Sequence, residues 1–348
     1  MKTVNTRSFP RIGFLGNPSD GYYGKTMSFA FSEYCVDLTL TESSKMRFVP
    51  GEVDDASFDS PEKLVRDIRL YGYYGGIRML KAVAKLFFEY CFERGIEIEK
   101  RNFTAEYRTN IPRLVGLSGS SAICSAMLKA LMKFYSVEIP LEYTPTICLE
   151  AEKLELGINC GFQDRVIQMY NGLVFMDFEK SFVEANNRGK YERIDPSLLP
   201  NVYVAFDPNR AEESGKAHKK VKKLFEEKKP DILSAMVEFA DIAQQGRDAL
   251  LAGKKELIPA LVDANFDLRD RIFNVAELNR NMVMVARSAG ASAKFAGSGG
   301  AIVGTYEDEA QYSLLCNKLA EIGCTTFKPT IAISDEALPS NIGNWRNS

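Results

Sequence analysis

Two hydrophobic periods alternate along the first half of the chain. Residues 11–15 and 27–41 form strand-like runs separated by a glycine-rich turn, and residues 103–108 alternate with the period of a half-buried strand. Residues 61–95 and 122–135 instead place apolar side chains every three or four positions, which predicts amphipathic helices.

The mixture continues through the middle of the chain. Residues 145–154 and 163–170 predict two helices separated by a glycine-broken loop, and residues 173–178 predict a strand after the turn Asn171-Gly172. Residues 184–200 are charged and contain glycine and proline, so we interpret them as the junction between two halves of the chain.

The second half begins with a predicted strand at residues 202–206. Long helical patterns then run to about residue 288, followed by a strand pair at 292–305, a helix at 308–322 and a strand at 325–333. The last dozen residues are expected to be a loose tail. Strands and helices do not alternate regularly, which favours an α+β architecture over a doubly wound sheet.

Composition limits the function classes. With 348 residues, 45% of them hydrophobic and 26% charged, the chain is expected to form about two globular domains. A net charge of −2 and a pI near 5.8 argue against nucleic acid as the main partner. The lysine-rich stretch 216–229 is interpreted as a solvated helix face. Without a signal core or a run of about 18 apolar residues, we expect no membrane partner and a cytoplasmic location.

The reactive side chains narrow the chemistry. Seven scattered cysteines form no CxxC pair, so we expect reduced, buried thiols and no disulfide framework or zinc site. The single histidine, His218, excludes mechanisms that need a histidine triad or a pair of histidine ligands. A proton acceptor must therefore be a carboxylate, a lysine, a tyrosine or a cysteine.

The segment Gly116-Leu117-Ser118-Gly119-Ser120-Ser121 stands between an extended stretch and a strong helix. Its glycines let backbone amides approach an anion, and the helix dipole favours a phosphate there. Its serines could also reach a phosphate or Mg²⁺. Taken alone, the segment could equally be a glycine turn with a serine helix cap. A second glycine cluster, Gly297-Ser298-Gly299-Gly300, favours the phosphate interpretation, because glycines in strand-like settings mark close approach of a ligand or another backbone.

Two familiar nucleotide motifs are absent. Gly24-Lys25-Thr26 resembles the end of a Walker A loop, but Ser19 occupies the position of the required glycine. Gly297 and Gly299 lack the third glycine of a dinucleotide fingerprint, because Ile302 stands there. A nicotinamide-dependent oxidoreductase is therefore disfavoured.

Three segments in order, residues 10–20, 116–122 and 291–303, resemble the three motifs of the GHMP kinase superfamily. The resemblance implies a two-domain fold, with residues 1–190 as a ribosomal protein S5 domain 2-like N-terminal domain and residues 200–335 as a ferredoxin-like C-terminal domain. It also implies ATP and Mg²⁺. The nucleotide-binding residues that it implies are Gly116, Leu117, Ser118, Gly119, Ser120, Ser121, Ala122, Gly297, Ser298 and Gly299.

Within that superfamily the chain most resembles the glucuronokinases. The stretches that carry this likeness are RIGFLGNPSDGYYGKT (11–26), LVGLSGSSAI (114–123), GFQDRV (161–166), NGLVFMDF (171–178) and NFDLRDRIF (265–273). Galactokinases carry an acidic residue and a histidine where this chain has Asn17 and Pro18. The resemblance implies ATP-dependent phosphorylation of the anomeric hydroxyl of D-glucuronate. Galactose, arabinose or a heptose phosphate are alternative acceptors, and an inactive sugar- or ATP-binding regulator is an alternative from another class.

The resemblance also assigns catalytic and metal-binding residues. Asp164 matches the aspartate that accepts the hydroxyl proton, and Arg11 matches a basic residue beside the transferred phosphoryl group. Glu152 resembles the magnesium-binding glutamate, with Ser120 or Ser121 as its partner, although Glu150 is a competitor. Without the resemblance, Asp164 could be a helix-start carboxylate and Glu152 an exposed helix residue.

The sugar-binding residues follow from the same motifs. The residues implied are Asn17, Asp20, Tyr22, Tyr23, Lys25 and Arg165. A uronic acid also needs a cation for its carboxylate. The candidates are Lys25, Arg113, Arg165 and Arg269, and the sequence does not choose among them. The oligomeric state is not predicted.

Overall fold

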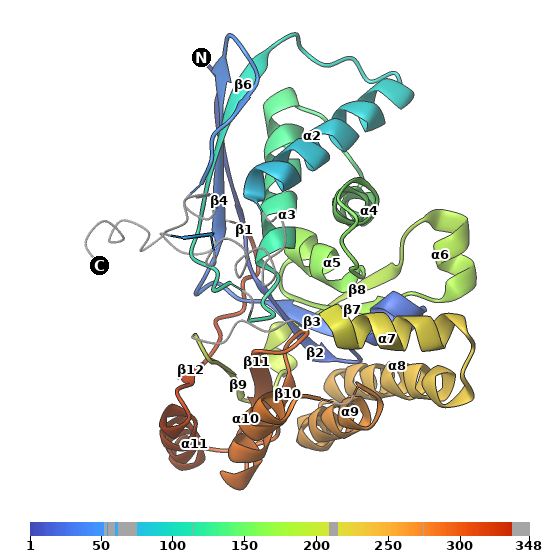
Figure 1. The fold of residues 1–348 in the computed structure, drawn as a ribbon, viewed down its shortest axis with the longest axis vertical. Coiled ribbons are helices and arrows are strands. Elements are labelled where there is room, and N and C mark those ends of the chain that lie inside the picture. The colour runs from blue at the N-terminus through green and yellow to red at the C-terminus, as the bar shows by residue number, and fades with distance from the viewer. Residues whose placement is uncertain are drawn as a thin grey trace.

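Three four-stranded sheets organise the part of the chain that the computed structural model describes, namely residues 1–51, 54, 60–61, 75–113, 115–208, 215–273 and 275–335. Helices cover these sheets on separate faces, and the sheets are stacked along the long axis of the molecule (Figure 1). The predicted α+β class is confirmed: most strands pair antiparallel, and strands and helices do not alternate regularly along the chain.

The first sheet contains, in spatial order, β1 (Thr3–Ser8), β4 (Val36–Ser43), β6 (Asn102–Thr109) and β5 (Arg47–Phe48). Alternate residues of β4 and β6 are buried, as expected for strands with one covered face. The covering helices are α2 (Gly76–Glu93) and α3 (Gly119–Tyr135), which lie together against this sheet (Figure 1). The sheet therefore fixes the direction in which α3 presents its N-terminus.

The second sheet contains β2 (Arg11–Leu15), β3 (Lys25–Ala30), β7 (Leu173–Asp177) and β8 (Lys190–Ile194). Neighbouring residues of β3 point to opposite faces: Ser28 donates a hydrogen bond to Gln163 of α5 (Gln163–Tyr170), whereas Met27 faces α8 (Pro230–Leu251). Since α9 (Ile258–Phe273) also packs on β2, helices from the two halves of the chain enclose this sheet.

The third sheet contains β10 (Lys294–Phe295), β11 (Ala301–Thr305), β9 (Val202–Phe206) and β12 (Thr325–Phe327). Helices α10 (Glu277–Ser288) and α11 (Glu309–Glu321) cover it with a separate apolar core. An aromatic cluster of Phe31, Tyr34, Phe206 and Phe327 joins this sheet to the first half, and Phe31 also forms a β-bridge with Ile331. The halves are thus packed together as one body.

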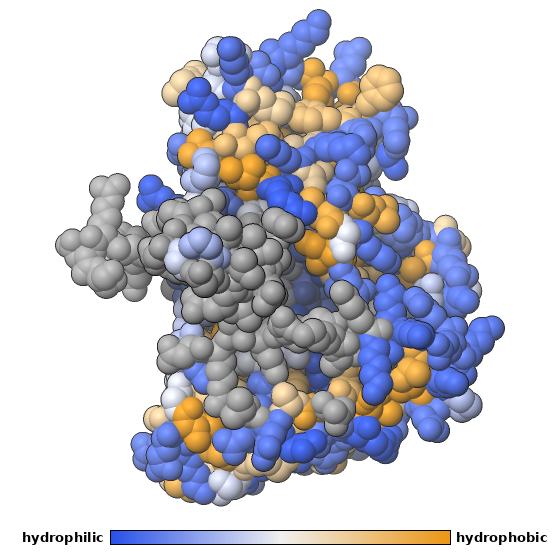
Figure 2. Space-filling model, in the orientation of Figure 1, coloured by the Kyte–Doolittle hydropathy of each residue, from blue (hydrophilic) through white to orange (hydrophobic). Residues whose placement is uncertain are grey.

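Shorter elements complete the description. They are the 3₁₀ helices η1 (Ser19–Tyr22), η3 (Leu141–Tyr143), η5 (Pro196–Leu198) and η6 (Lys255–Leu257), the π-helical turn η4 (Ala151–Glu155), and the helices α4 (Thr144–Glu150), α6 (Lys180–Asn186) and α7 (Gly215–Glu226). Mostly hydrophilic side chains cover the surface over α6, α7 and α8 (Figure 2). No helix among the described residues is long and apolar enough to cross a membrane.

Most predicted elements are confirmed. The helix at 163–170 and the strand at 202–206 begin and end at the expected residues. The helix expected at 122–135 begins three residues earlier, at Gly119. The helix expected at 145–154 changes to a π-helical turn at Ala151. The strand expected at 325–333 ends at Phe327.

The interpretation of residues 184–200 as a junction was wrong in part, because strand β8 lies within it and pairs with β7. Its charged residues belong to an edge strand with one solvent-exposed face. The sequence of such a strand resembles that of a linker. The division into domains at residues 190 and 200 stays a prediction. Residues 62–74 of one predicted helix lie outside the described residues, and so do the last dozen residues, which were predicted to be a tail.

Candidate active site

A cleft of about 1100 Å³ collects most of the residues that the sequence analysis singled out. Its walls come from η1, from the stretch that leads into α3, from residues 149–165, from α7 and from the loop at Gly297 and Ser298. These segments are distant in the sequence, and the sheets and helices described above bring them to one place. A volume of this size is suited to a small-molecule ligand.

The two glycine clusters meet in the cleft wall. A Cβ atom on Gly116 would lie 2.5 Å from the Gly299 carbonyl oxygen, and one on Gly297 would lie 2.2 Å from the Gly116 carbonyl oxygen. Gly116 also has a positive φ of 76°, which disfavours other residues. The glycines are therefore required because two backbones touch, and this contact joins the loop before α3 to the loop between β10 and β11.

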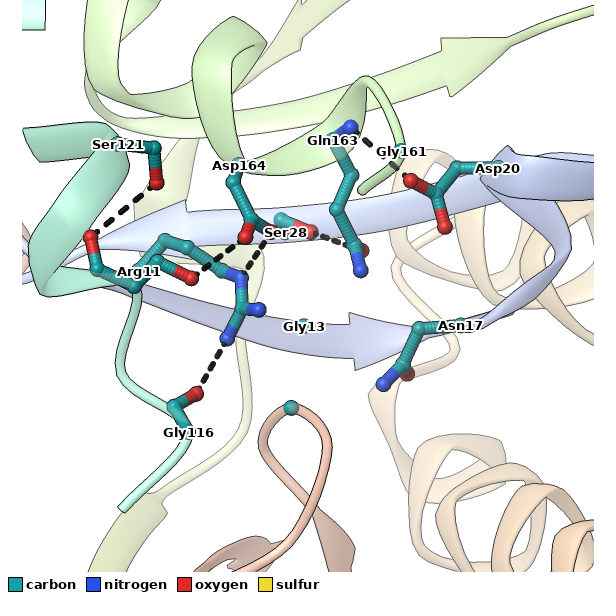
Figure 3. Close-up of polar contacts among 12 residues, drawn as sticks. Arg11, Gly13, Asn17, Asp20, Ser28, Gly116, Ser121, Gly161, Gln163 and Asp164 are labelled. Carbon is teal, nitrogen blue, oxygen red and sulfur yellow. Dashed lines mark hydrogen bonds and ion pairs between the residues drawn. The ribbon is translucent and has the colours of Figure 1, made fainter. Parts of the chain in front are cut away.

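Arg11 joins three segments of this wall. Its Nε donates to Asp164 Oδ1 at 2.5 Å, and its Nη1 donates to the carbonyl oxygens of Gly116 and Ala296 at 2.7 and 3.0 Å. Figure 3 shows the Arg11 guanidinium between the Asp164 carboxylate and Gly116. Because Arg11 lies at the start of β2 and is only 5% exposed, the second sheet holds its guanidinium rigidly beside the carboxylate.

Asp164 lies in the first turn of α5 and stays ionised. Burial alone would raise the pKa of its carboxyl group, but the positive charges of Arg11 and Arg165 and hydrogen bonds from Arg11 and Ser118 outweigh burial, so its pKa lies below the ordinary value. Ser118 Oγ donates to Asp164 Oδ2 at 2.7 Å. Both carboxylate oxygens are thus held in fixed positions at the cleft.

Ser118 itself has a left-handed backbone conformation, with φ at 62°. Its carbonyl oxygen accepts hydrogen bonds from Gln168 Nε2 and Ser121 Oγ, which hold the loop before α3 in this conformation. As a result Ser121 is fully buried with its hydroxyl turned to Ser118, whereas Ser120 faces the cleft. Of the predicted nucleotide-binding residues, Ala122 is also buried, and Ser121, Ala122 and Gly299 do not line the cleft.

Glu152 and Arg165 line the cleft and form a buried ion pair. The guanidinium Nε of Arg165 lies 2.7 Å from Glu152 Oε2, its Nη2 contacts the same oxygen, and its Nη1 donates to the Gly161 carbonyl oxygen at 2.9 Å. The other carboxylate oxygen, Glu152 Oε1, is buried and accepts no hydrogen bond from the described residues. Burial raises the pKa of Glu152, and Arg165 offsets only part of this effect.

Asp20 lies in η1 and lines the cleft beside Gly161 and Gln163. Its Oδ2 accepts a hydrogen bond from the Gln163 backbone amide at 3.2 Å (Figure 3). Burial, and secondarily the negative charge of Asp164, raises the pKa of Asp20 to about 6. Gly161 makes room for this carboxylate, since a Cβ atom there would lie 2.0 Å from Asp20 Oδ2. Gly161 is a positioning residue that the sequence analysis missed, although it stands in the GFQDRV stretch.

Asn17 is held by a lysine that the sequence analysis also missed as a site residue. Lys294 is fully buried, and its ammonium donates to Asn17 Oδ1 and the Gly13 carbonyl oxygen, both at 2.6 Å, and to its own neighbour's carbonyl at 2.8 Å. Burial, followed by the positive charges of Arg269 and Arg11, lowers the pKa of Lys294 well below its ordinary value. Lys294 therefore fastens the third motif to the first.

The remaining predicted sugar-binding residues have different positions. Tyr22 and Tyr23 line the cleft, and burial, followed by the charge of Asp20, raises the pKa of Tyr22 to about 12. Lys25 does not line it, because its ammonium donates to Gln244 Oε1 at 2.8 Å and lies 3.8 Å from an Asp177 oxygen. Arg165 lines the cleft but is already paired with Glu152.

Of the other cations considered for a substrate carboxylate, Arg113 and Arg269 both line the cleft. Arg269 is buried and donates to the carbonyl oxygens of Gly297 and Ser298 at 2.8 and 3.0 Å, so it supports the glycine loop. Glu150, the competitor for the metal role, also lines the cleft and accepts a hydrogen bond from Asn187.

Comparison with known proteins gives consistent matches. The sequence profile described as GHMP kinases N terminal domain matches residues 78–172. The chain is 45% identical to probable glucuronokinase 2 of Arabidopsis thaliana over 85% of this chain and 82% of that protein. It is 42% identical to glucuronokinase 1 of the same plant over 95% of this chain and 93% of that protein. A crystal structure of Lactococcus lactis galactokinase complexed with galactose superposes with a TM-score of 0.74 over 96% of this chain and 94% of that chain, at 15% sequence identity.

Proposed function

The chain belongs to the GHMP kinases, and we propose that it transfers the γ-phosphoryl group of ATP to the anomeric hydroxyl of D-glucuronate. The observation that carries the catalytic part is the group Arg11–Asp164–Ser118, which lies where the two glycine loops meet. The choice of sugar is supported by the two relatives named glucuronokinase, which match most of the chain.

In the proposed step, Asp164 accepts the proton of the anomeric hydroxyl while the oxygen of that hydroxyl bonds to the γ-phosphorus of ATP. The bond between the γ-phosphorus and the bridging oxygen breaks, and that oxygen leaves with ADP. Arg11 stabilises the negative charge on the transferred group. A carboxylate with a lowered pKa is a weak base in the free enzyme. When phosphate oxygens share the charge of Arg11, the pKa of Asp164 rises, so its basicity increases once ATP is bound.

The residues of the cleft fit the two ligands that such a reaction requires. The N-terminus of α3, with Ser118, Gly119 and Ser120 in the cleft wall, offers backbone amides and the positive end of the helix dipole to phosphate oxygens. Glu152 Oε1, buried and unpartnered among the described residues, and the Ser120 hydroxyl would hold Mg²⁺, which takes few protein oxygens. Bound there, Mg²⁺ would neutralise phosphate charge.

Asp20 is proposed to accept hydrogen bonds from sugar hydroxyl groups. It faces the cleft together with Tyr22 and Asn17, and its one hydrogen-bond donor among the described residues is the backbone amide of Gln163, which leaves other lone pairs for a ligand. The seven cysteines are all unbonded thiols, which supports the cytoplasm as the proposed location.

The test is a substrate panel. The purified protein is assayed with ATP and Mg²⁺ on D-glucuronate, D-galacturonate, D-glucose, D-galactose, L-arabinose and a heptose 7-phosphate, and phosphorus NMR identifies the modified position. We expect the highest kcat/KM for D-glucuronate, with the phosphate on C1. Preference for a neutral sugar would overturn the choice of substrate. Binding of ATP and sugar without transfer would show that the protein is a regulator.

A further inference from the structure

The carboxylate of a hexuronic acid is attached to C5, which lies across the ring oxygen from the reacting C1. A cation that recognises it must therefore belong to a different part of the cleft from the group around Asp164. Arg11 and Arg165 are each bound to a carboxylate of the protein, and Arg269 supports the glycine loop. None of these three is placed to discriminate an acid sugar from a neutral one.

Helix α7 supplies another cation. Lys222, Phe225 and Glu226 line the cleft, and they are three and four positions apart, so they share one face of the helix. The ring of Phe225 lies edge-on against Tyr22, with centroids 4.9 Å apart. This contact fixes the cleft-facing side of α7 beside η1, the element that carries Asp20.

The Lys222 ammonium also contacts the loop that precedes α5. It lies 3.3 Å from Asn159 Oδ1, two residues before Gly161, and Gly161 packs directly on the Asp20 carboxylate. Among the described residues its ammonium contacts no carboxylate, in contrast to its neighbour Lys223, which pairs with Glu227 at 3.8 Å. Because its partner is a neutral amide, Lys222 keeps two of its three N–H donors available.

We propose that Lys222 binds the carboxylate of the acid sugar and thereby makes the enzyme select a uronic acid over neutral hexoses. This inference rests on the proposed function, because it requires glucuronate to be the substrate. Asn159 orients the lysine, and Phe225 with Tyr22 holds α7 in place. Lys222 is solvent-exposed, so its removal is not expected to affect folding.

The experiment compares Lys222→Gln with the matched control Lys223→Gln, and Lys222→Arg serves as a rescue. We measure kcat and KM for D-glucuronate and for ATP, and the binding of D-glucuronate and its neutral methyl ester by calorimetry with a non-hydrolysable ATP analogue. For Lys222→Gln we expect the KM for glucuronate to rise about ten- to hundredfold, with kcat changed less than about threefold, because a charge-assisted bond to substrate is lost. Lys223→Gln should behave as wild type.

Two further readouts exclude a merely structural effect. The wild type should bind D-glucuronate more tightly than its methyl ester, and Lys222→Gln should show no such preference. The KM of the wild type for glucuronate should also rise more steeply with added salt than that of Lys222→Gln. If the wild type phosphorylates glucuronate but Lys222→Gln keeps both the KM and the preference, only this inference is overturned. If the wild type does not phosphorylate glucuronate, the proposed function fails first and this inference falls with it.

Discussion

Asp164 and Asp20 face the same cleft from two elements, α5 and η1, and both are largely buried. Asp164 has two guanidinium groups and a serine hydroxyl around it, and its pKa is lowered. Within the part of the chain that the structure describes, Asp20 has one backbone amide as its hydrogen-bond partner, and burial raises its pKa to about 6. Burial raises the pKa of both carboxyl groups, so the charged donors around each decide the direction of the net shift. The comparison separates a carboxylate fixed as an anion from one that titrates near neutral pH.

Removing the first carboxylate should have the largest effect. We expect Asp164→Asn to lower kcat by about 10²–10⁴-fold, the usual contribution of a general base, while ATP affinity changes only a few-fold. Steady-state kinetics and calorimetry with ATP measure the two effects. Asp177→Asn, which removes a carboxylate near Lys25 outside the cleft, is the control and should keep wild-type turnover. Near-normal turnover in Asp164→Asn would show that another group is the base.

Replacing the main charged donor of Asp164 tests why its pKa is low. Arg11→Met should lower kcat by about 10²–10³-fold, because stabilisation of the transferred group is lost. It should also raise the pKa of Asp164, because burial is then opposed mainly by Arg165. The acidic limb of the kcat–pH profile should move to higher pH, whereas loss of positioning alone would lower the profile without moving that limb. Arg11→Lys should not rescue activity, since a lysine cannot reproduce contacts to Asp164 and two carbonyl oxygens.

The second carboxylate should be visible in stability. The folded-state pKa of Asp20, about 6, lies above its unfolded value of 3.8, so its contribution is present at low pH and is lost as pH rises through about 6. Ionised Asp20 therefore costs about 3 kcal/mol above pH 7. We expect the free energy of unfolding of Asp20→Asn, measured with denaturant, to increase relative to that of the wild type as the pH rises from 4 to 7. A difference that does not depend on pH would contradict the raised pKa.

The smallest effect concerns the space around Asp20. Gly161→Ala would place a Cβ atom within 2.0 Å of Asp20 Oδ2 and displace the carboxylate. We expect the KM for the sugar to rise about tenfold, with a smaller change in kcat, because binding is affected more than transfer. Gly21→Ala, in the same wall but with no protein atom within 4 Å of the added Cβ, is the control. Equal KM values in the two variants would show that Asp20 tolerates displacement.

Much of the fold follows from local patterns. The sequence of residues 163–170 and 202–206 predicted a helix and a strand with the bounds that the structure has. Residues 184–200 were wrongly interpreted as a junction throughout, because the solvent-exposed side of β8 is charged and the strand forms only by pairing with β7. Propensity and period are properties of a segment, whereas pairing requires a partner elsewhere in the chain.

The site divides in the same way. The sequence by itself determined which residue types were available: a glycine-serine stretch before a helix, one histidine only, and carboxylates at positions 20, 152 and 164. Only the tertiary structure decided their states. It turned Ser121 inward and Ser120 to the cleft, paired Arg165 with Glu152, placed Lys25 outside the cleft and placed Lys222 of α7 in the cleft wall. Electrostatic and steric effects depend on distances between atoms, and those distances are set when segments far apart in the chain pack together.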